Sequence, residues 1–150
     1  MQRLVIAAAA VAAFATALPA AAQFQKPEDA VKYRKAGFTL MAAHFGRLGA
    51  MAQGRVPFDA ASATANAEIV ATLSKLPFAG FVEGTSGTEK GQPKPNVWSE
   101  RAKFDEGAKK MQEEVAKLAA AAKAGPDAFK TAFGAAAGTC KSCHDNFRVQ

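Results

Sequence analysis

The sequence is poor in the residues that build disulfide scaffolds and most protein metal sites. Its 150 residues include only two cysteines and two histidines. Both cysteines and one histidine fall within the segment CKSCH, from Cys140 to His144. A disulfide between these cysteines would close too short a loop to stabilise the fold much. A four-ligand zinc site would have to recruit His44, the only other cysteine or histidine. The sequence therefore favours neither a disulfide nor a zinc site.

Beyond the first 22 residues the sequence contains no long apolar run. A positive charge at Arg3 precedes an alanine-rich apolar run, which ends at Pro19 and three alanines. The run is short for a membrane span, which needs about 20 apolar residues. A positive start, an apolar stretch and small residues at a cleavage site are typical of a secretory signal peptide. We predict that residues 1–22 are cleaved, that residues 23–150 form one domain in the periplasm, and that no segment spans a membrane.

Blocks of one charge sign are also missing. The formal net charge of +6 would by itself suggest a nucleic-acid partner. The basic residues of the second half are interspersed with acidic ones, as is typical of a solvated helix face. They include Lys103, Lys109, Lys110, Lys117 and Lys123. We therefore expect no nucleic-acid partner.

Strand-like alternation is absent, and four segments instead carry core-type residues three and four positions apart. The segments begin near Pro27, Asp59, Ser99 and Pro126. Proline suits the first position of a helix and aspartate suits the N-cap. The clearest stripes are Val31, Arg34, Phe38, Met41, Phe45 and Leu48 in the first segment, and Phe104, Ala108, Met111, Val115, Leu118 and Ala122 in the third.

The second and third segments are separated by residues 77–98, which include three prolines and four glycines. A loop of this length inside a compact domain is uncommon and is usually functional or mobile. We interpret it as a crossover loop along one side of the domain. The predicted fold is all-α, an antiparallel four-helix bundle with a long crossover loop between helices two and three.

The spacing C-x-x-C-H is typical of covalent haem attachment. Residues three and four positions apart share one face of a helix, so Cys140, Cys143 and His144 project together. The two thiols can then add to the vinyl groups of one haem c while His144 ligates the iron. The alternative is a redox-active C-x-x-C pair, which sits at a helix start where the dipole lowers the thiol pKa. Here the pair lies near the end of the last predicted helix, which favours haem.

Function depends on the second axial position of that iron. A low-spin electron carrier needs a second strong ligand, commonly methionine or histidine. Met41 lies on the predicted core-facing stripe of the first helix, although filling the core is the commoner role of such a methionine. His44 falls off that stripe. A six-coordinate, low-spin electron carrier with Met41 as second axial ligand is therefore retained as an alternative.

The chain resembles the class II c-type cytochromes, and the cytochrome c′ family in particular, over nearly all of residues 23–150. The resemblance is carried by QFQKPEDAVKYRKAGFTLMAAHFGR from Gln23, by LSKLPFAGF and WSE further along, and by TAFGAAAGTCKSCHDNFR from Thr131. It implies a five-coordinate, high-spin haem whose other face is capped by an apolar side chain. The matching position is Phe38, where some relatives have leucine. The resemblance also implies a homodimer.

The same resemblance implies further contacts with the haem. In the family, the arginine that matches Arg148 sits beside the proximal pocket, where nitric oxide can displace the histidine. Arg148 follows His144 by four positions, so we expect the two on one helix face. Arg34 would lie near a haem propionate with Lys35 beside it, and Glu89 in the crossover loop would contact the haem edge.

These observations predict a haem protein that binds small neutral gases, takes part in electron transfer, or both. An apolar cap offers no hydrogen-bond donor and would strip anions of their hydration, which favours nitric oxide and carbon monoxide. A catalytic haem enzyme is not expected, because no distal acid/base pair is evident. The expected partners are diatomic gases and a redox protein whose identity does not follow from the sequence.

Overall fold

The computed structural model describes residues 23–150, and the predicted signal peptide, residues 1–22, lies outside the described residues. Four long helices dominate this range: α1 (Pro27–Ala52), α2 (Ala60–Leu73), α4 (Arg101–Ala124) and α5 (Pro126–Phe147). The connection between α2 and α4 contains a 3-10 helix, η2 (Pro77–Gly80), and one short helix, α3 (Asn96–Ser99). Within residues 23–150, no helix has the length and apolar character needed to cross a membrane.

Local sequence signals set the ends of the helices. Proline occupies the first turn of α1, and Glu28 and Asp29 in the same turn complement the helix dipole. The Asp59 carboxylate caps α2 by accepting a hydrogen bond from the backbone N–H of Ser62 at 2.7 Å. Gly125 alone separates α4 from α5 and has a φ of 119°, a value that suits glycine. The chain therefore reverses there within a single residue.

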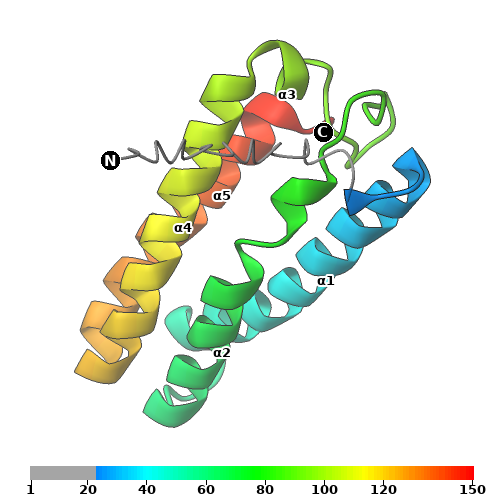
Figure 1. Ribbon diagram of the computed structural model, residues 1–150. Helices are drawn as coiled ribbons and strands as arrows, with labels where there is room; N and C mark the ends of the chain where they lie inside the picture. The colour runs from blue at the N-terminus through cyan, green and yellow to red at the C-terminus, as the bar shows by residue number, and fades with distance from the viewer. Residues whose placement is uncertain (1–22) are drawn as a thin grey trace, which may run out of the picture.

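The long helices form one closed ring around a common core. α1 packs on α2, α2 on α4, α4 on α5, and α5 returns to α1, as can be followed in Figure 1. The core-facing stripe predicted for the third helix is buried along its whole length, from Phe104 to Ala122. Leu48 from α1, Val70 from α2 and Phe129 from α5 complete the core. The predicted four-helix bundle is confirmed.

The crossover loop is more ordered than the sequence predicts. The second helix ends at Leu73, short of the Pro77 boundary, and η2 and α3 lie within the stretch expected to be irregular. η2 packs against α1 so closely that a Cβ on Gly80 would lie 2.6 Å from the carbonyl oxygen of Ala30. A glycine is needed there because only its bare backbone fits against α1.

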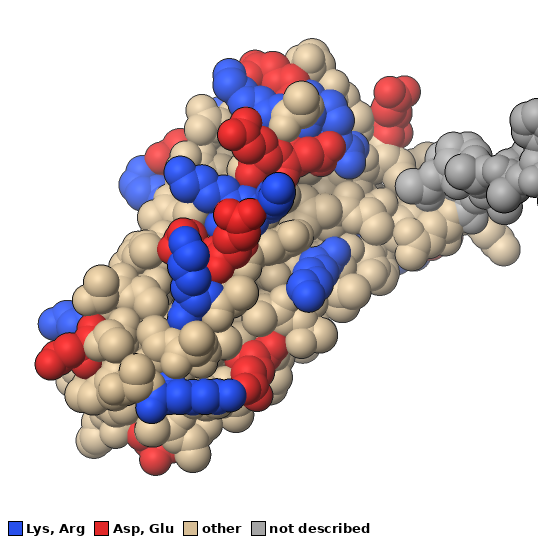
Figure 2. Space-filling view, turned by 60° about the vertical axis from the view of Figure 1, so that its left-hand side comes forward, with Lys and Arg blue, Asp and Glu red and all other residues tan. Residues whose placement is uncertain are grey.

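Charged side chains of both signs are interleaved on the outer faces of the bundle. Figure 2 shows acidic and basic side chains side by side on one face of the molecule. The ion pairs on α4 include Arg101–Asp105 at 2.8 Å and Lys117–Glu114 at 2.6 Å. This arrangement agrees with the solvated helix face that the sequence indicates.

Replacing Gly80 with alanine tests the close approach of η2 to α1. We expect Gly80→Ala to lower the free energy of unfolding by about 1–3 kcal/mol, because the new methyl group must push the loop off α1. Denaturant unfolding of the haem-loaded protein measures this. Gly134 in α5 is the control, because a methyl group added there would meet nothing within 4 Å. Gly134→Ala should instead stabilise by about 0.5–1 kcal/mol, and equal losses in both variants would contradict the assignment.

The cap of α2 makes a pH-dependent contribution to stability. Hydrogen bonds from Ser62 hold the pKa of the Asp59 carboxyl below its ordinary value of 3.8. A group whose pKa is lowered by folding stabilises the protein above the unfolded pKa and loses that contribution as the pH falls through the folded pKa. We expect Asp59→Ala to lower the melting temperature at pH 7, with the difference from wild type shrinking below about pH 4. Asp59→Asn keeps a capping oxygen, so its smaller difference should not depend on pH in this way.

Candidate functional site

A large cavity opens between the helices at the end of the bundle that carries the crossover loop. Its volume is about 740 Å³, and residues of all four long helices and of the crossover loop line it. Most of the lining side chains are apolar, among them Val31, Phe45, Val70, Phe78, Phe104 and Val115. Cys140, Cys143 and His144 line the same cavity from α5. The predicted helix face is therefore turned toward an apolar space large enough for a flat cofactor.

The two cysteines are half-buried free thiols. Burial raises the pKa of the Cys140 thiol and, together with the neighbouring Cys140, that of the Cys143 thiol. A redox-active C-x-x-C pair needs the opposite shift, because its attacking group is a thiolate. The environment of these cysteines thus disfavours the redox alternative and suits two neutral thiols that face an apolar partner.

His144 lines the cavity from the last turn of α5. Partial burial lowers the pKa of its imidazole, and the positive charge of Arg148 lowers it further against the opposing effect of Asp145. The neutral imidazole is the form that binds a metal. The surroundings of His144 therefore favour the protonation state that an iron ligand requires.

Phe38 of α1 enters the cavity inside a cluster of aromatic rings. Its ring meets those of Phe78 and Phe81 edge to face, with centroids 5.9 and 6.1 Å apart. Phe81 also contacts Phe104 of α4, with ring centroids 4.8 Å apart. Edge-to-face contacts of this kind favour a defined orientation of the rings. Phe38 is thus positioned by neighbours from the crossover loop, and no local pattern in the sequence had singled out Phe81.

Arg34 lines the cavity, but its side chain is 5% exposed and is bonded to the crossover loop. Its Nη1 donates to the carbonyl oxygen of Gly80 at 3.0 Å and to Oγ1 of Thr85 at 2.6 Å. Its Nη2 donates to the carbonyl oxygen of Thr85 at 2.8 Å, and its guanidinium carbon lies 4.9 Å from the centroid of the Phe81 ring. Arg34 therefore fixes residues 80–85 on α1, a role that the sequence did not indicate for it or for Thr85.

Lys35 and Glu89, the other two charged residues predicted to lie near the haem, differ in whether they line the cavity. Lys35 is exposed and lines the cavity next to Arg34. Glu89 is exposed and is not among the residues that line the cavity, and its carboxylate accepts a hydrogen bond from Nε2 of Gln92 at 3.2 Å. The predicted contact of Glu89 with the haem edge thus receives no support from the geometry.

Arg148 is the C-cap residue of α5. α5 ends at Phe147, and Arg148 is extended, with φ −118° and ψ 137°. Its N–H still donates to the carbonyl oxygen of His144 at 3.1 Å, four residues earlier, and both side chains line the cavity. The extended backbone of Arg148, which the sequence did not indicate, forms an antiparallel bridge with Pro93 of the crossover loop. Arg148 lines the cavity together with Gly91 and Pro93.

The remaining candidates for a second iron ligand differ in whether they line the cavity. Met41 lines the cavity, and so does Met111 of α4, which the sequence indicated only as a core residue. His44 is not among the lining residues, and its Nδ1 lies 2.8 Å from Oδ1 of Asn66 on α2. This position agrees with the expectation that His44 lies off the stripe that faces the core.

The residues of the cavity fit a covalently attached haem. Two thiols and one imidazole from a single helix end face a largely apolar space, and Phe38 with its aromatic neighbours closes part of it. Arg34 and Lys35 supply positive charge at its wall, where the carboxylates of a haem would be accepted. The thiol pKa values and the neutral imidazole agree with the chemistry of attachment and iron binding.

Comparisons with known proteins agree with this site. A family model described as Cytochrome C' matches residues 29–148. The chain is 48% identical over 127 residues to the cytochrome c′ of Alcaligenes xylosoxydans xylosoxydans and 51% identical over 127 residues to that of Rubrivivax gelatinosus. Each alignment covers 84% of this chain and 98% of the relative.

Solved structures give the same result. The crystal structure of the Rubrivivax gelatinosus cytochrome c′ has a TM-score of 0.78 at 50% identity and covers 84% of this chain and 99% of that one. A nitric oxide complex of a variant of Alcaligenes xylosoxidans cytochrome c prime has a TM-score of 0.78 at 46% identity, covering 85% of this chain and 98% of that one. The Shewanella frigidimarina protein has a TM-score of 0.80 at 39% identity, with 85% and 99% covered. The chain belongs to the cytochrome c′ family and carries covalently bound haem c.

Proposed function

We propose that this protein is a periplasmic, mono-haem cytochrome with a five-coordinate, high-spin iron that binds small neutral gases, takes part in electron transfer, or both. Cys140 and Cys143 hold the haem and His144 is its iron ligand. The observation that carries the proposal is the aromatic cap, Phe38, which faces the same cavity as the motif of α5. A phenylalanine at this place has no lone pair to offer to iron.

The protein's contribution is to shape and dry the space around the iron. The haem, when bound, supplies an iron with one open coordination position. Phe38, Phe78 and Phe81 surround that space with hydrocarbon edges and exclude water. Because Phe38 donates no hydrogen bond, polar or charged ligands lose their hydration without compensation, whereas nitric oxide and carbon monoxide lose little. The nitric oxide complex of a mutant of the Alcaligenes relative supports this choice of ligand.

Basic residues have separate roles in the proposal. Arg34 and Lys35 neutralise the propionates, and Arg34 at the same time holds residues 80–85 against α1. Arg148 stands beside His144 on the proximal side, where its positive charge lowers the pKa of the imidazole. A nearby cation also disfavours protonation of a released imidazole, so Arg148 influences how readily His144 leaves and returns.

Export and assembly belong to the same proposal. Residues 1–22 act as the signal peptide, and the mature chain of residues 23–150 is a homodimer. Among the described residues the exposed large apolar side chains are Leu40 on α1, Ile69 on α2, and Val56 and Leu76 in the segments that follow these helices. Their exposure supports the homodimer, because a second copy would bury them.

Met41 keeps the second candidate function open, because its side chain lines the cavity. In that case the protein is a low-spin electron carrier with a thioether as second axial ligand. Methionine at such a position is also a common core filler, and the contacts of Phe38 within the aromatic cluster favour the first candidate.

An optical spectrum of the reduced protein separates the two functions. We expect a high-spin ferrous spectrum that changes on addition of carbon monoxide, because His144 is then the single protein ligand of the iron. Met41→Leu should leave that spectrum unchanged. A sharp low-spin spectrum that disappears in Met41→Leu would establish the electron carrier instead.

Shortening Phe38 tests its role as cap. We expect Phe38→Ala to speed carbon monoxide association about tenfold, which corresponds to a barrier lower by about 1.4 kcal/mol. Stopped-flow mixing of the reduced protein with carbon monoxide measures the rate. Phe58→Ala is a matched control, because Phe58 packs on Phe129 and does not line the cavity. Identical rates in wild type and Phe38→Ala would remove Phe38 from the role of cap.

A further inference from the structure

The end of the helix that carries His144 is held by the crossover loop. The last four carbonyls of a helix have no partner within it and must be satisfied elsewhere. In α5 the carbonyl oxygen of His144 accepts from the backbone N–H of Arg148 at 3.1 Å and from Nε2 of Gln150 at 3.0 Å. The next three carbonyls, of residues 145–147, accept hydrogen bonds from the crossover loop.

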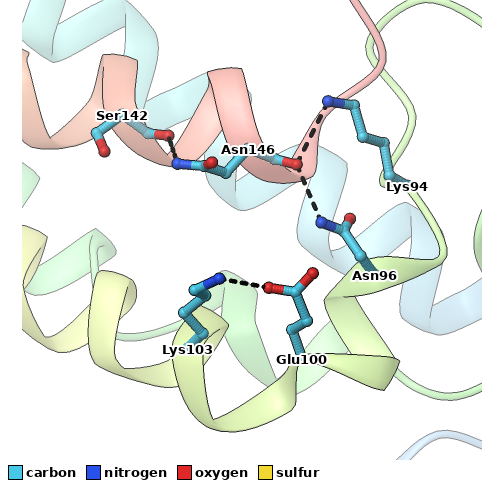
Figure 3. Close-up of polar contacts among 6 residues, drawn as sticks. All are labelled: Lys94, Asn96, Glu100, Lys103, Ser142 and Asn146. Carbon is cyan, nitrogen blue, oxygen red and sulfur yellow. Dashed lines mark hydrogen bonds and ion pairs between the residues drawn. The ribbon is translucent and has the colours of Figure 1, made fainter.

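Lys94 makes most of these bonds, and Figure 3 shows Lys94 and Asn96 converging on the end of α5. The ammonium group of Lys94 donates to the carbonyl oxygen of Asp145 at 3.0 Å and to that of Asn146 at 3.3 Å. Nδ2 of Asn96 donates to the same carbonyl of Asn146 at 3.2 Å. The backbone N–H of Lys94 donates to the carbonyl oxygen of Phe147 at 2.9 Å.

Backbone pairing continues this attachment past the helix. The N–H of Val149 donates to the carbonyl oxygen of Gln92, and the N–H of Gly91 donates to that of Val149, both at 2.9 Å. Residues 91–96 thus run along residues 145–149 without a break. The final turn of a helix normally frays, and here a second segment holds it.

We propose that Lys94 and Asn96 are positioning residues for His144, forming a clamp that holds the iron ligand in place. This role depends on one part of the proposed function, namely that His144 is the ligand of the iron. The clamp bonds residues 145 and 146, which directly follow His144 in the same helical turn. A fixed turn keeps the imidazole in reach of the iron and opposes its movement away.

The chemistry of Lys94 suits this task. A cation near the C-terminus of a helix interacts favourably with the helix dipole and with the last carbonyls. One ammonium group with several donors can bridge two successive carbonyls, which no neutral side chain of similar length does with the same strength. Asn96 adds a neutral donor to the same carbonyl of Asn146. The clamp therefore combines a charged contact with an uncharged one, and each can be removed alone.

The test compares haem-loaded variants by two measurements. Resonance Raman spectroscopy of the ferrous protein gives the iron–histidine stretching frequency, and hydrogen exchange gives the opening rate of the Arg148 and Val149 amides. The variants are Lys94→Met, Asn96→Ala and Lys94→Arg. Lys90→Met is the control, because Lys90 is an exposed cation on the same loop. Lys94→Met keeps the backbone bond from residue 94 to Phe147, so the loop should remain docked.

We expect Lys94→Met to shift the stretching frequency downward and to speed exchange of both amides about tenfold, the factor expected for loss of a charge-assisted hydrogen bond. Asn96→Ala should give smaller changes in the same direction. Lys94→Arg should restore both readings toward wild type, because its guanidinium also donates to carbonyls. Lys90→Met should match wild type.

Other results overturn the clamp. Faster amide exchange with an unchanged stretching frequency would mean that the loop holds the helix end without acting on the ligand. Equal shifts in Lys90→Met and Lys94→Met would assign the effect to charge alone. The spectrum of the wild-type protein tests the proposed function separately, because a six-coordinate haem there would contradict that function. Equal stretching frequencies and exchange rates in Lys94→Met and Lys90→Met would contradict only the clamp.

Discussion

The structure depends on the hydrogen bonds that the free backbone carbonyls at the C-terminal end of α5 accept. α5 must turn Cys140, Cys143 and His144 toward an apolar cavity within its last two turns, where its own carbonyls have no partners inside the helix. Those carbonyls would tend to draw water into the turn that carries the imidazole. Hydrogen bonds from Lys94 and Asn96 supply partners instead. A long loop at this place therefore brings donors to the end of α5 from a part of the chain about fifty residues away.

The same loop also shapes the opposite part of the cavity wall. Arg34 of α1 bonds Gly80 and Thr85, and this attachment sets Phe81 beside Phe38. The two ends of the crossover loop are thus fixed by different means. Near α1 the loop supplies acceptors to a buried cation, and near α5 it supplies donors to free carbonyls. The aromatic cap and the histidine turn are consequently connected through one segment of chain.

Sequence reasoning succeeded where a single helix period decides the outcome. The stripe from Phe104 to Ala122, the proline at the start of α1 and the motif on α5 are local patterns, and the structure confirms the bundle they predict. It did not predict the parts of the backbone that tertiary pairing decides. Arg148 lies four residues after His144, but its backbone is extended and pairs with Pro93 of the crossover loop. Thr85 and Lys94 carry no local signal, because their partners lie about fifty residues away.

The position of Arg148 at the C-cap of α5 matters for the part of the cavity that His144 lines. Its N–H donates to the carbonyl oxygen of His144 at 3.1 Å. The extended backbone of Arg148 is also held by the crossover loop, through the pairing of residues 91–94 with residues 147–149. Its positive charge helps to lower the pKa of the His144 imidazole, so the loop that holds this end of the chain also holds a cation near the histidine.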